Sequence, residues 1–137
     1  KKKEEERKKE IASRAKEPRG ELFTITAYDL SVRSCGKPVG SKGYGITTSS
    51  FNLSGHTWQS ARTVAADPRI YPMGTQLRLT FVGEGYQKYN GVYTVRDTGG
   101  AIKGNTLDFF MGDFHSNETH QSVWDFGRVK AYVEVVN

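Results

Sequence analysis

Hydrophobic and polar residues alternate along six short stretches of the chain, and this alternation is typical of strands with one buried face. The stretches are rich in β-branched and aromatic residues, and they cover residues 22–28, 62–66, 76–82, 92–96, 106–111 and 129–136. Few segments show a helical period. The pattern predicts a mainly β fold, a small six-stranded barrel with short helices and long loops.

The segments between these strands carry turn and loop signals. Residues 29–50 are rich in Gly, Ser, Lys and Pro, and a loop of this length in a compact domain is often functional. Asn90-Gly91 is a hairpin signal before the fourth strand. Residues 52–61 and 112–121 are polar, and their pattern predicts no regular element.

Residues 1–20 contain nine lysines and arginines against five glutamates, a net charge of +4. Glu4 with Lys8 has the favoured order of an exposed helical pair, and Pro18 and Gly20 end the segment. The sequence thus predicts a charged helical or disordered linker over residues 1–20, followed by one domain over residues 21–137. A membrane-surface or partner helix is the alternative, which the lack of an apolar stripe disfavours. We expect no signal peptide and no membrane insertion, because no apolar stretch is long enough.

The whole chain has a formal charge of +5, so residues 21–137 carry only +1. A nearly neutral domain argues against a nucleic-acid-binding function that depends on phosphate contacts. Cys35 is the single cysteine, which excludes an intrachain disulfide and disfavours a cysteine-based metal site.

Two aspartates stand out in residues 95–110, which read VRDTGGAIKGNTLDFF. Asp97 ends a predicted strand before Gly99 and Gly100, whereas Asp108 lies inside an apolar run. Apolar flanks raise the pKa of a carboxyl group, and a protonated carboxyl suits general acid catalysis. Staying largely protonated at neutral pH requires a pKa rise of roughly 3. Taken singly, Asp97 could instead cap its own turn, and Asp108 could face solvent.

Several separate motifs resemble the three-aspartate (3D) domain. They are Ala66-Asp67-Pro68, Pro72-Met73-Gly74-Thr75, Asp97 to Gly104 and Leu107-Asp108, with Thr26-Ala27-Tyr28 and Gly45-Ile46-Thr47-Thr48-Ser49 upstream. Ser50 stands where many members of the family have glycine. The resemblance covers the chain from about Phe23 onward and implies a double-psi β-barrel.

The resemblance also implies an activity, that of the lytic transglycosylases which cleave peptidoglycan glycan strands. Asp108 would protonate the bond between N-acetylmuramic acid and N-acetylglucosamine and then act as the base, giving a 1,6-anhydro product. Asp97 would orient the acid, and Asp67 would complete the acidic cluster. No metal or organic cofactor is implied, and we expect a monomer in the cell wall or periplasm, or associated with a phage.

Four further residues are candidates for substrate binding. The glycines Gly99 and Gly100 would let backbone amides approach a sugar, and Thr47 and Lys103 would hydrogen-bond its N-acetyl or hydroxyl groups. Lys103 could equally be a solvated turn residue.

Three other interpretations remain open. A non-catalytic glycan-binding module could keep the same groove without chemistry. Asp97-Thr98-Gly99 also matches the aspartic protease triplet, but a protease would need two such loops and hence a dimer. Asp113, His115, Glu118 and His120 could bind a metal, although their spacing fits no strong ligand motif.

Overall fold

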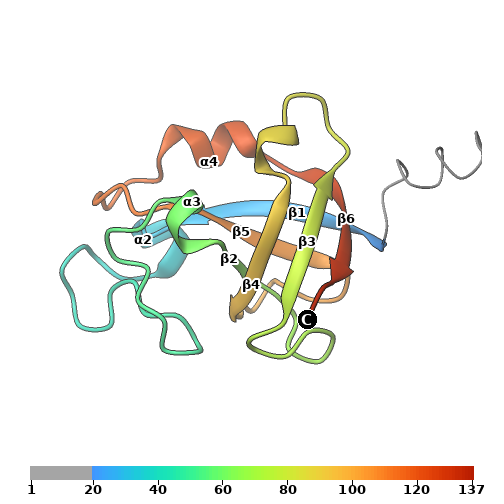
Figure 1. The fold of residues 1–137 in the computed structure, drawn as a ribbon. Helices are drawn as coiled ribbons and strands as arrows, with labels where there is room; N and C mark the ends of the chain where they lie inside the picture. Colours follow the sequence, from blue (N-terminus) through green and yellow to red (C-terminus); the bar gives the residue numbers. More distant parts are fainter. Residues whose placement is uncertain (1–19) are drawn as a thin grey trace, which may run out of the picture.

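The computed structural model describes residues 20–137, which form a six-stranded barrel with short helices on its surface (Figure 1). The strands are β1 (Glu21–Asp29), β2 (Thr63–Ala65), β3 (Gln76–Phe81), β4 (Gly91–Asp97), β5 (Thr106–Gly112) and β6 (Val129–Val135). The helices are α2 (Val32–Cys35), α3 (Trp58–Ala61), the 3-10 helix η1 (Gln87–Tyr89) and α4 (Gln121–Phe126). All six predicted strands and the mainly β class are confirmed. The predicted linker over residues 1–20 lies, except for Gly20, outside the described residues.

The six strands close in the order β1-β5-β2-β4-β3-β6. The pairs β1–β5 and β2–β4 are parallel, and the other four pairs are antiparallel. Parallel neighbours cannot be joined by a tight turn, and accordingly neither parallel pair consists of strands that follow one another in the chain. The predicted barrel is confirmed, and its double-psi arrangement stays a prediction.

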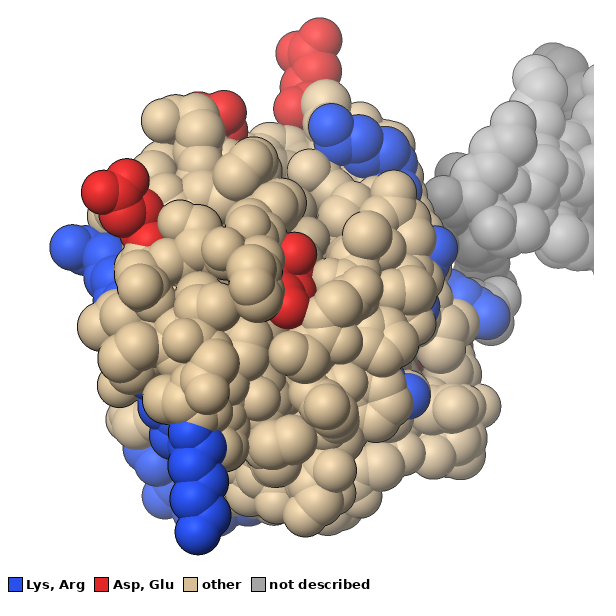
Figure 2. Space-filling view, turned by 90° about the vertical axis from the view of Figure 1, so that its left-hand side faces the viewer, with Lys and Arg blue, Asp and Glu red and all other residues tan. Residues whose placement is uncertain are grey.

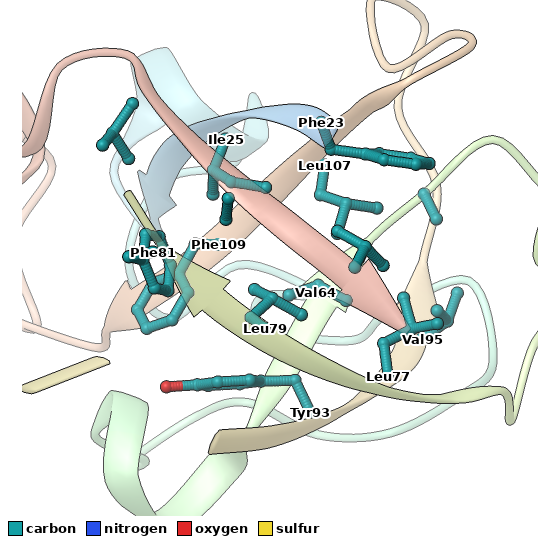
Figure 3. Packing of buried hydrophobic residues seen from close by; sticks show 14 of the residues in the cluster. Phe23, Ile25, Val64, Leu77, Leu79, Phe81, Tyr93, Val95, Leu107 and Phe109 are labelled. Carbon is teal, nitrogen blue, oxygen red and sulfur yellow. The ribbon is translucent and has the colours of Figure 1, made fainter. Parts of the chain in front are cut away.

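Alternate residues of the strands fill the interior of the barrel. Figure 3 shows side chains from different strands, among them Ile25, Leu79 and Phe109, pointing toward one another in this core. On β5, Leu107 and Phe109 are fully buried in it. Burying one such side chain stabilises a fold by about 1.5–3 kcal/mol. The even-numbered residues of β5, including Asp108, therefore face the outside of the barrel wall.

A second apolar cluster covers part of this outer wall. Its buried members are Tyr28, Leu30, Tyr44, Leu53, Ala61, Ala65, Ile102 and Phe110. Tyr44 and Leu53 come from the connection between α2 and α3, and Ile102 comes from the β4–β5 connection. These two connections fold back over the barrel and shield an outer face that would otherwise be solvated.

Short helices formed in segments where the sequence placed no particular helix, and α2 and α3 are the two shortest α-helices among them. Ser31 caps α2 by accepting a hydrogen bond from the Ser34 amide, and Thr57 caps α3 in a reciprocal pair with Ser60. Helices of four residues contain too few periodic positions to be recognised from a pattern.

The hairpin signal at Asn90-Gly91 was wrong about the turn. β3 and β4 do pair antiparallel, but residues 82–90 join them and include η1. The Asn90 side chain accepts a 2.8 Å hydrogen bond from the Phe81 amide, and Gly91 is already the first residue of β4. The dipeptide thus closes a longer connection instead of forming a two-residue turn.

Candidate active site

Asp97 and Asp108 lie on either side of strand β2. Ala65 of β2 is the register partner of Asp97 in the parallel β2–β4 pair and of Asp108 in the antiparallel β2–β5 pair. Because neighbouring strands are about 4.8 Å apart, the two aspartate Cα atoms are separated by roughly 10 Å. Ala65 carries only a methyl group, so little side-chain volume separates the two carboxyl groups.

A cleft of about 230 Å³ lies over this part of the wall. Asp97, Asp108 and Tyr28 supply polar groups to it, and Leu30, Leu53, Ala65 and Ile102 supply apolar surface. Figure 2 looks onto the side of the molecule that carries α2, α3 and the adjoining loops, and shows a largely uncharged face with most basic side chains near its edges. Such a face suits a ligand that is mainly neutral, with a few polar groups fixing its orientation.

The carboxyl group of Asp108 has a pKa raised from its ordinary value of 3.8 to about 6. Burial is the largest cause, because it removes water from the charged form. A hydrogen bond from the Thr26 hydroxyl (2.9 Å) lowers the pKa, and the charge of Asp97 raises it. At pH 7 roughly a tenth of the molecules carry the proton, which is less than the largely protonated acid expected from the sequence.

The source of the burial also differs from the expectation. The chain neighbours of Asp108, Leu107 and Phe109, belong to the interior core and point away from its carboxyl group. The outer cluster on the same face as Asp108, which includes Tyr28 and Phe110, shields it instead. An aspartate within an apolar run is therefore buried here by folded-back loops, which the run itself does not reveal.

Asp97 is the acceptor for several donors at the end of β4. Its Oδ1 accepts hydrogen bonds from the Thr48 amide (3.1 Å), the Thr48 hydroxyl (3.0 Å) and the Thr98 amide (2.9 Å). Its Oδ2 lies 3.5 Å from the Tyr28 hydroxyl, which donates to it. These contacts fix the orientation of the carboxylate and join the loop at Thr48 to the barrel.

Tyr28 donates to Asp97 and lies near the charge of Asp108. Burial, followed by the nearby charges of Asp97 and Asp108, raises the pKa of its phenol well above the usual value. The phenol therefore keeps its proton across the physiological pH range and remains a hydrogen-bond donor. Its ring packs on Phe110 with 5.6 Å between the ring centroids, which fixes the position of the hydroxyl.

Asp67 does not line the cleft. It is almost fully buried, and its carboxylate accepts hydrogen bonds from the Arg69 guanidinium (2.7 and 3.0 Å) and the Gly104 amide (3.1 Å). The Arg69 side chain and the backbone amides hold the pKa of Asp67 well below its usual range. Gly104 has a φ of 60°, in the left-handed region, so Asp67 fixes the conformation of the β4–β5 connection. This geometry gives Asp67 a structural role instead of the predicted place in the acidic cluster.

Of the four predicted substrate-binding residues, Gly99 lines the cleft and the other three do not. A Cβ at the position of Gly99 would come within 2.9 Å of the Ile102 side chain. Gly100 and Lys103 are exposed and lie outside the lining. Thr47 is buried, and its hydroxyl accepts a hydrogen bond from the Phe51 amide within its own loop, while the adjacent Thr48 reaches Asp97.

Sequence reasoning did not nominate Thr26, Tyr28, Thr48 or Ala65 as site residues. One signal for the first two was available, since Thr26 and Tyr28 alternate with Ile25 and so share the outer face of β1. Thr48 and Ala65 gave no such signal, because their roles depend on which segments meet in space.

Asp113, one of the candidate metal ligands of the loop after β5, has a structural role. Asp113 accepts hydrogen bonds from the Tyr44 hydroxyl (2.6 Å) and the Gly55 amide (2.8 Å), which tie two loops together. Within residues 20–137, no group of three or more His, Cys, Asp or Glu side chains is arranged to hold a metal ion. None of the helices in that range is long and apolar enough to cross a membrane.

The protein is thus a closed β-barrel whose surface cleft contains two aspartates, Asp97 and the partly buried Asp108. The chain belongs to the 3D domain family, whose family model matches residues 62–137 and so includes Asp67, Asp97 and Asp108. This membership confirms the resemblance seen in the sequence.

Two curated relatives come from Bacillus subtilis (strain 168). The chain is 29% identical over 131 residues to the putative cell wall shaping protein YabE, covering 94% of this chain and 26% of that protein. It is 37% identical over 67 residues to the cell wall-binding protein YocH, covering 49% of this chain and 20% of that protein. The chain thus spans about a quarter or less of each relative.

Solved structures with some likeness include two lytic transglycosylases. MltA from E. coli with bound chitohexaose aligns with a TM-score of 0.47 and 22% identity, over 77% of this chain and 30% of that one. LtgG of Burkholderia pseudomallei aligns with a TM-score of 0.46 and 19% identity, over 66% of this chain and 25% of that one. Likeness of this degree carries no conclusion about activity.

Proposed function

We propose that this domain is a peptidoglycan lytic transglycosylase in which Asp108 acts first as general acid and then as general base. The observation that carries the proposal is the carboxyl group of Asp108, whose pKa of about 6 occurs inside a cleft shared with Asp97. A carboxyl group with a pKa near the working pH can both give and take a proton. The names of the two relatives, which refer to cell wall shaping and cell wall binding, support a wall polymer as the substrate.

In the first step, Asp108 donates its proton to the oxygen that bridges C1 of N-acetylmuramic acid and C4 of N-acetylglucosamine. The C1–O bond breaks, its electron pair leaves with that oxygen, and positive charge develops at C1. The negative charge of Asp97 opposes ionisation of Asp108 before the reaction. The same charge favours the positive carbon once it forms.

In the second step, the Asp108 carboxylate takes the proton from the 6-hydroxyl of the same muramic acid residue. The 6-oxygen attacks C1 and closes the 1,6-anhydro ring, so no water is consumed and Asp108 is protonated again. Thr26 supports the intermediate state, because its hydroxyl donates to the ionised form of Asp108. Tyr28 keeps Asp97 in place through its hydroxyl.

The test is digestion of purified sacculi followed by mass spectrometry of the soluble products. The wild-type domain should release muropeptides with 1,6-anhydro ends, and Asp108→Asn should lower the rate by at least about a hundredfold. Asp125→Asn, which changes an exposed acid on α4, is the matched control and should leave the rate unchanged. Products with ordinary reducing ends would assign a hydrolase instead.

A second candidate is a non-catalytic module that binds the wall, which the name of the relative YocH favours. In that case sacculi should retain the domain without releasing any soluble product, and Asp108→Asn should leave retention unchanged. A dimeric aspartic protease is not favoured, because the second acid of the cleft, Asp108, lies within strand β5 and not in another Asp-Thr-Gly turn. We further propose that the domain works as a monomer on glycan strands in the wall or periplasm.

A further inference from the structure

A second concavity, of about 370 Å³, lies on the other side of Asp108 from the cleft. Asp108, Tyr28 and Ser34 line both hollows, so Asp108 stands between them. Thr26 lines only the second hollow. A polymer bound across Asp108 would therefore occupy both hollows, one on each side of the bond to be cleaved.

The second concavity contains two guanidinium groups and an exposed aromatic ring. Arg33 lies on α2, Trp124 lies on α4, and Arg128 directly precedes β6; we call these three residues the basic subsite. The guanidinium carbon of Arg33 lies 4.7 Å from the centroid of the Trp124 ring. Trp124 is 52% exposed, so part of its ring surface is accessible to a ligand.

The local fold brings these residues to Asp108. Val129 is the register partner of Ile25, so Arg128, one residue earlier, reaches β1 next to Thr26. Gly127 makes this possible, since its φ of 60° turns the chain sharply from α4 into β6. The basic subsite is thus joined to Thr26 and Asp108 by regular structure and not by a free loop.

The charge of this concavity is unbalanced. Among residues 20–137, Asp108 is the only acidic residue that lines it, and its raised pKa leaves it partly neutral near pH 6. Neither Arg33 nor Arg128 forms an ion pair with an acidic side chain among residues 20–137. A neutral glycan would leave two guanidinium groups without a charged partner, whereas a carboxylate could bind both.

We propose that the basic subsite binds the carboxylate-bearing part of the muramic acid residue next to the scissile bond, with Trp124 against the sugar ring. The carboxylate comes either from the peptide stem or from the lactyl group when the stem is absent. This inference rests on the proposed function, since it assumes a muramic acid polymer as the ligand. It makes the domain selective for peptidoglycan over neutral chitin-like chains, by charge and not by sugar shape.

The experiment is calorimetric binding in the Asp108→Asn background, so that no ligand is consumed. Three tetrasaccharides are compared: a peptidoglycan fragment with its stems, the same glycan after amidase has removed the stems, and neutral chitotetraose. Arg33→Gln and Arg128→Gln should each weaken binding of the stem-bearing fragment about tenfold at low salt, and binding of chitotetraose less than about twofold. Trp124→Ala should weaken binding of all three ligands.

The amidase-treated glycan identifies the source of the charge. If its binding also falls about tenfold, the lactyl carboxylate is bound; if only the stem-bearing fragment is affected, a stem carboxylate is bound. Arg33→Lys and Arg128→Lys keep the charge and should retain the salt dependence of binding. Arg78→Gln, on β3 and outside both hollows, is the control and should change nothing.

Equal losses for charged and neutral ligands, or no loss for the stem-bearing fragment, would overturn the inference. That failure is distinguishable from failure of the proposed function, which is judged by the anhydro products of wild-type protein on sacculi. A domain that releases anhydro products but binds charged and neutral tetrasaccharides alike in every arginine variant would keep the function and lose the basic subsite.

Discussion

The Thr26 hydroxyl donates a hydrogen bond of 2.9 Å to Oδ1 of Asp108 across the parallel pair of β1 and β5. The two residues are register partners, so the bond is fixed by the barrel and not by a mobile loop. It stabilises the charged carboxylate, whereas burial and Asp97 stabilise the neutral acid. The pKa of about 6 is therefore a balance that single substitutions can move.

Thr26→Val tests this balance while keeping the shape of the side chain. Without the donor the ionised form of Asp108 is less stable, so the pKa should rise by about 0.5–1. The pH at which activity on sacculi falls by half on the alkaline side should shift upward by the same amount. Thr24→Val, one alternation earlier on the same strand, touches Lys130 and not Asp108, and it should leave the profile in place.

Asp108→Asn should stabilise the fold, and more so at high pH. The folded state raises the pKa of Asp108, so the stability that this group contributes is full below pH 3.8 and is lost as the pH rises through about 6. Asparagine removes that loss. The gain in the free energy of unfolding should grow between pH 4 and pH 8 by at most about 3 kcal/mol.

Urea denaturation of wild type and Asp108→Asn at the two pH values measures this difference. The exposed Asp125→Asn serves as the matched control. A gain that is the same at pH 4 and pH 8 would mean that the carboxylate of Asp108 is not desolvated in the folded protein.

Ala65→Val should weaken ligand binding and also destabilise the fold. Ala65 lines the cleft but is a buried member of the outer apolar cluster, so the added methyl groups would meet both the cleft and the packed side chains of that cluster. The free energy of unfolding should fall by about 1–3 kcal/mol, while affinity for a glycan tetrasaccharide should fall by more than about tenfold. Ala101→Val, at an exposed position of the β4–β5 connection, is the comparison variant and should bind normally.

Asp67→Asn should act on the fold and only indirectly on the site. It weakens the contacts to Arg69 and to the Gly104 amide, so the β4–β5 connection that carries Gly99 loses its anchor. The melting temperature should fall by several degrees, and residual activity should keep the wild-type pH profile. A changed pH profile with an unchanged melting temperature would instead support the predicted catalytic role of Asp67.

The strands could be predicted because the alternation of apolar and polar residues in the sequence corresponds to the two faces of each strand in the structure. Each predicted strand contributes alternate apolar positions to the barrel interior, and the acids at positions 97 and 108 were recognisable by their unusual surroundings. The site as a whole could not be predicted, because its shape depends on register. Nothing local to Ala65 indicates that it separates two acids from two other strands.

The role of Asp67 shows a second limit of sequence reasoning. Its partner Gly104 lies 37 positions away along the chain, and its partner Arg69 looks like an ordinary exposed residue. The three aspartates of the motif suggested one acidic cluster. In the structure, however, Asp67 pairs with Arg69 and stabilises the β4–β5 connection through the Gly104 amide. The number of acids in a motif therefore does not give the number of acids in a cleft.

Strand β5 supports the core with one set of side chains and carries the reactive acid on the other, as described above. A single inserted residue upstream of Asp108 within this strand would exchange the two sets, putting a carboxyl group among phenylalanines and a phenylalanine in the cleft. Insertions in the preceding connection, around the exposed Gly100 and Ala101, do not change which residues of β5 face the core and which face the cleft. Relatives of this domain should consequently differ in length before β5 and never within it.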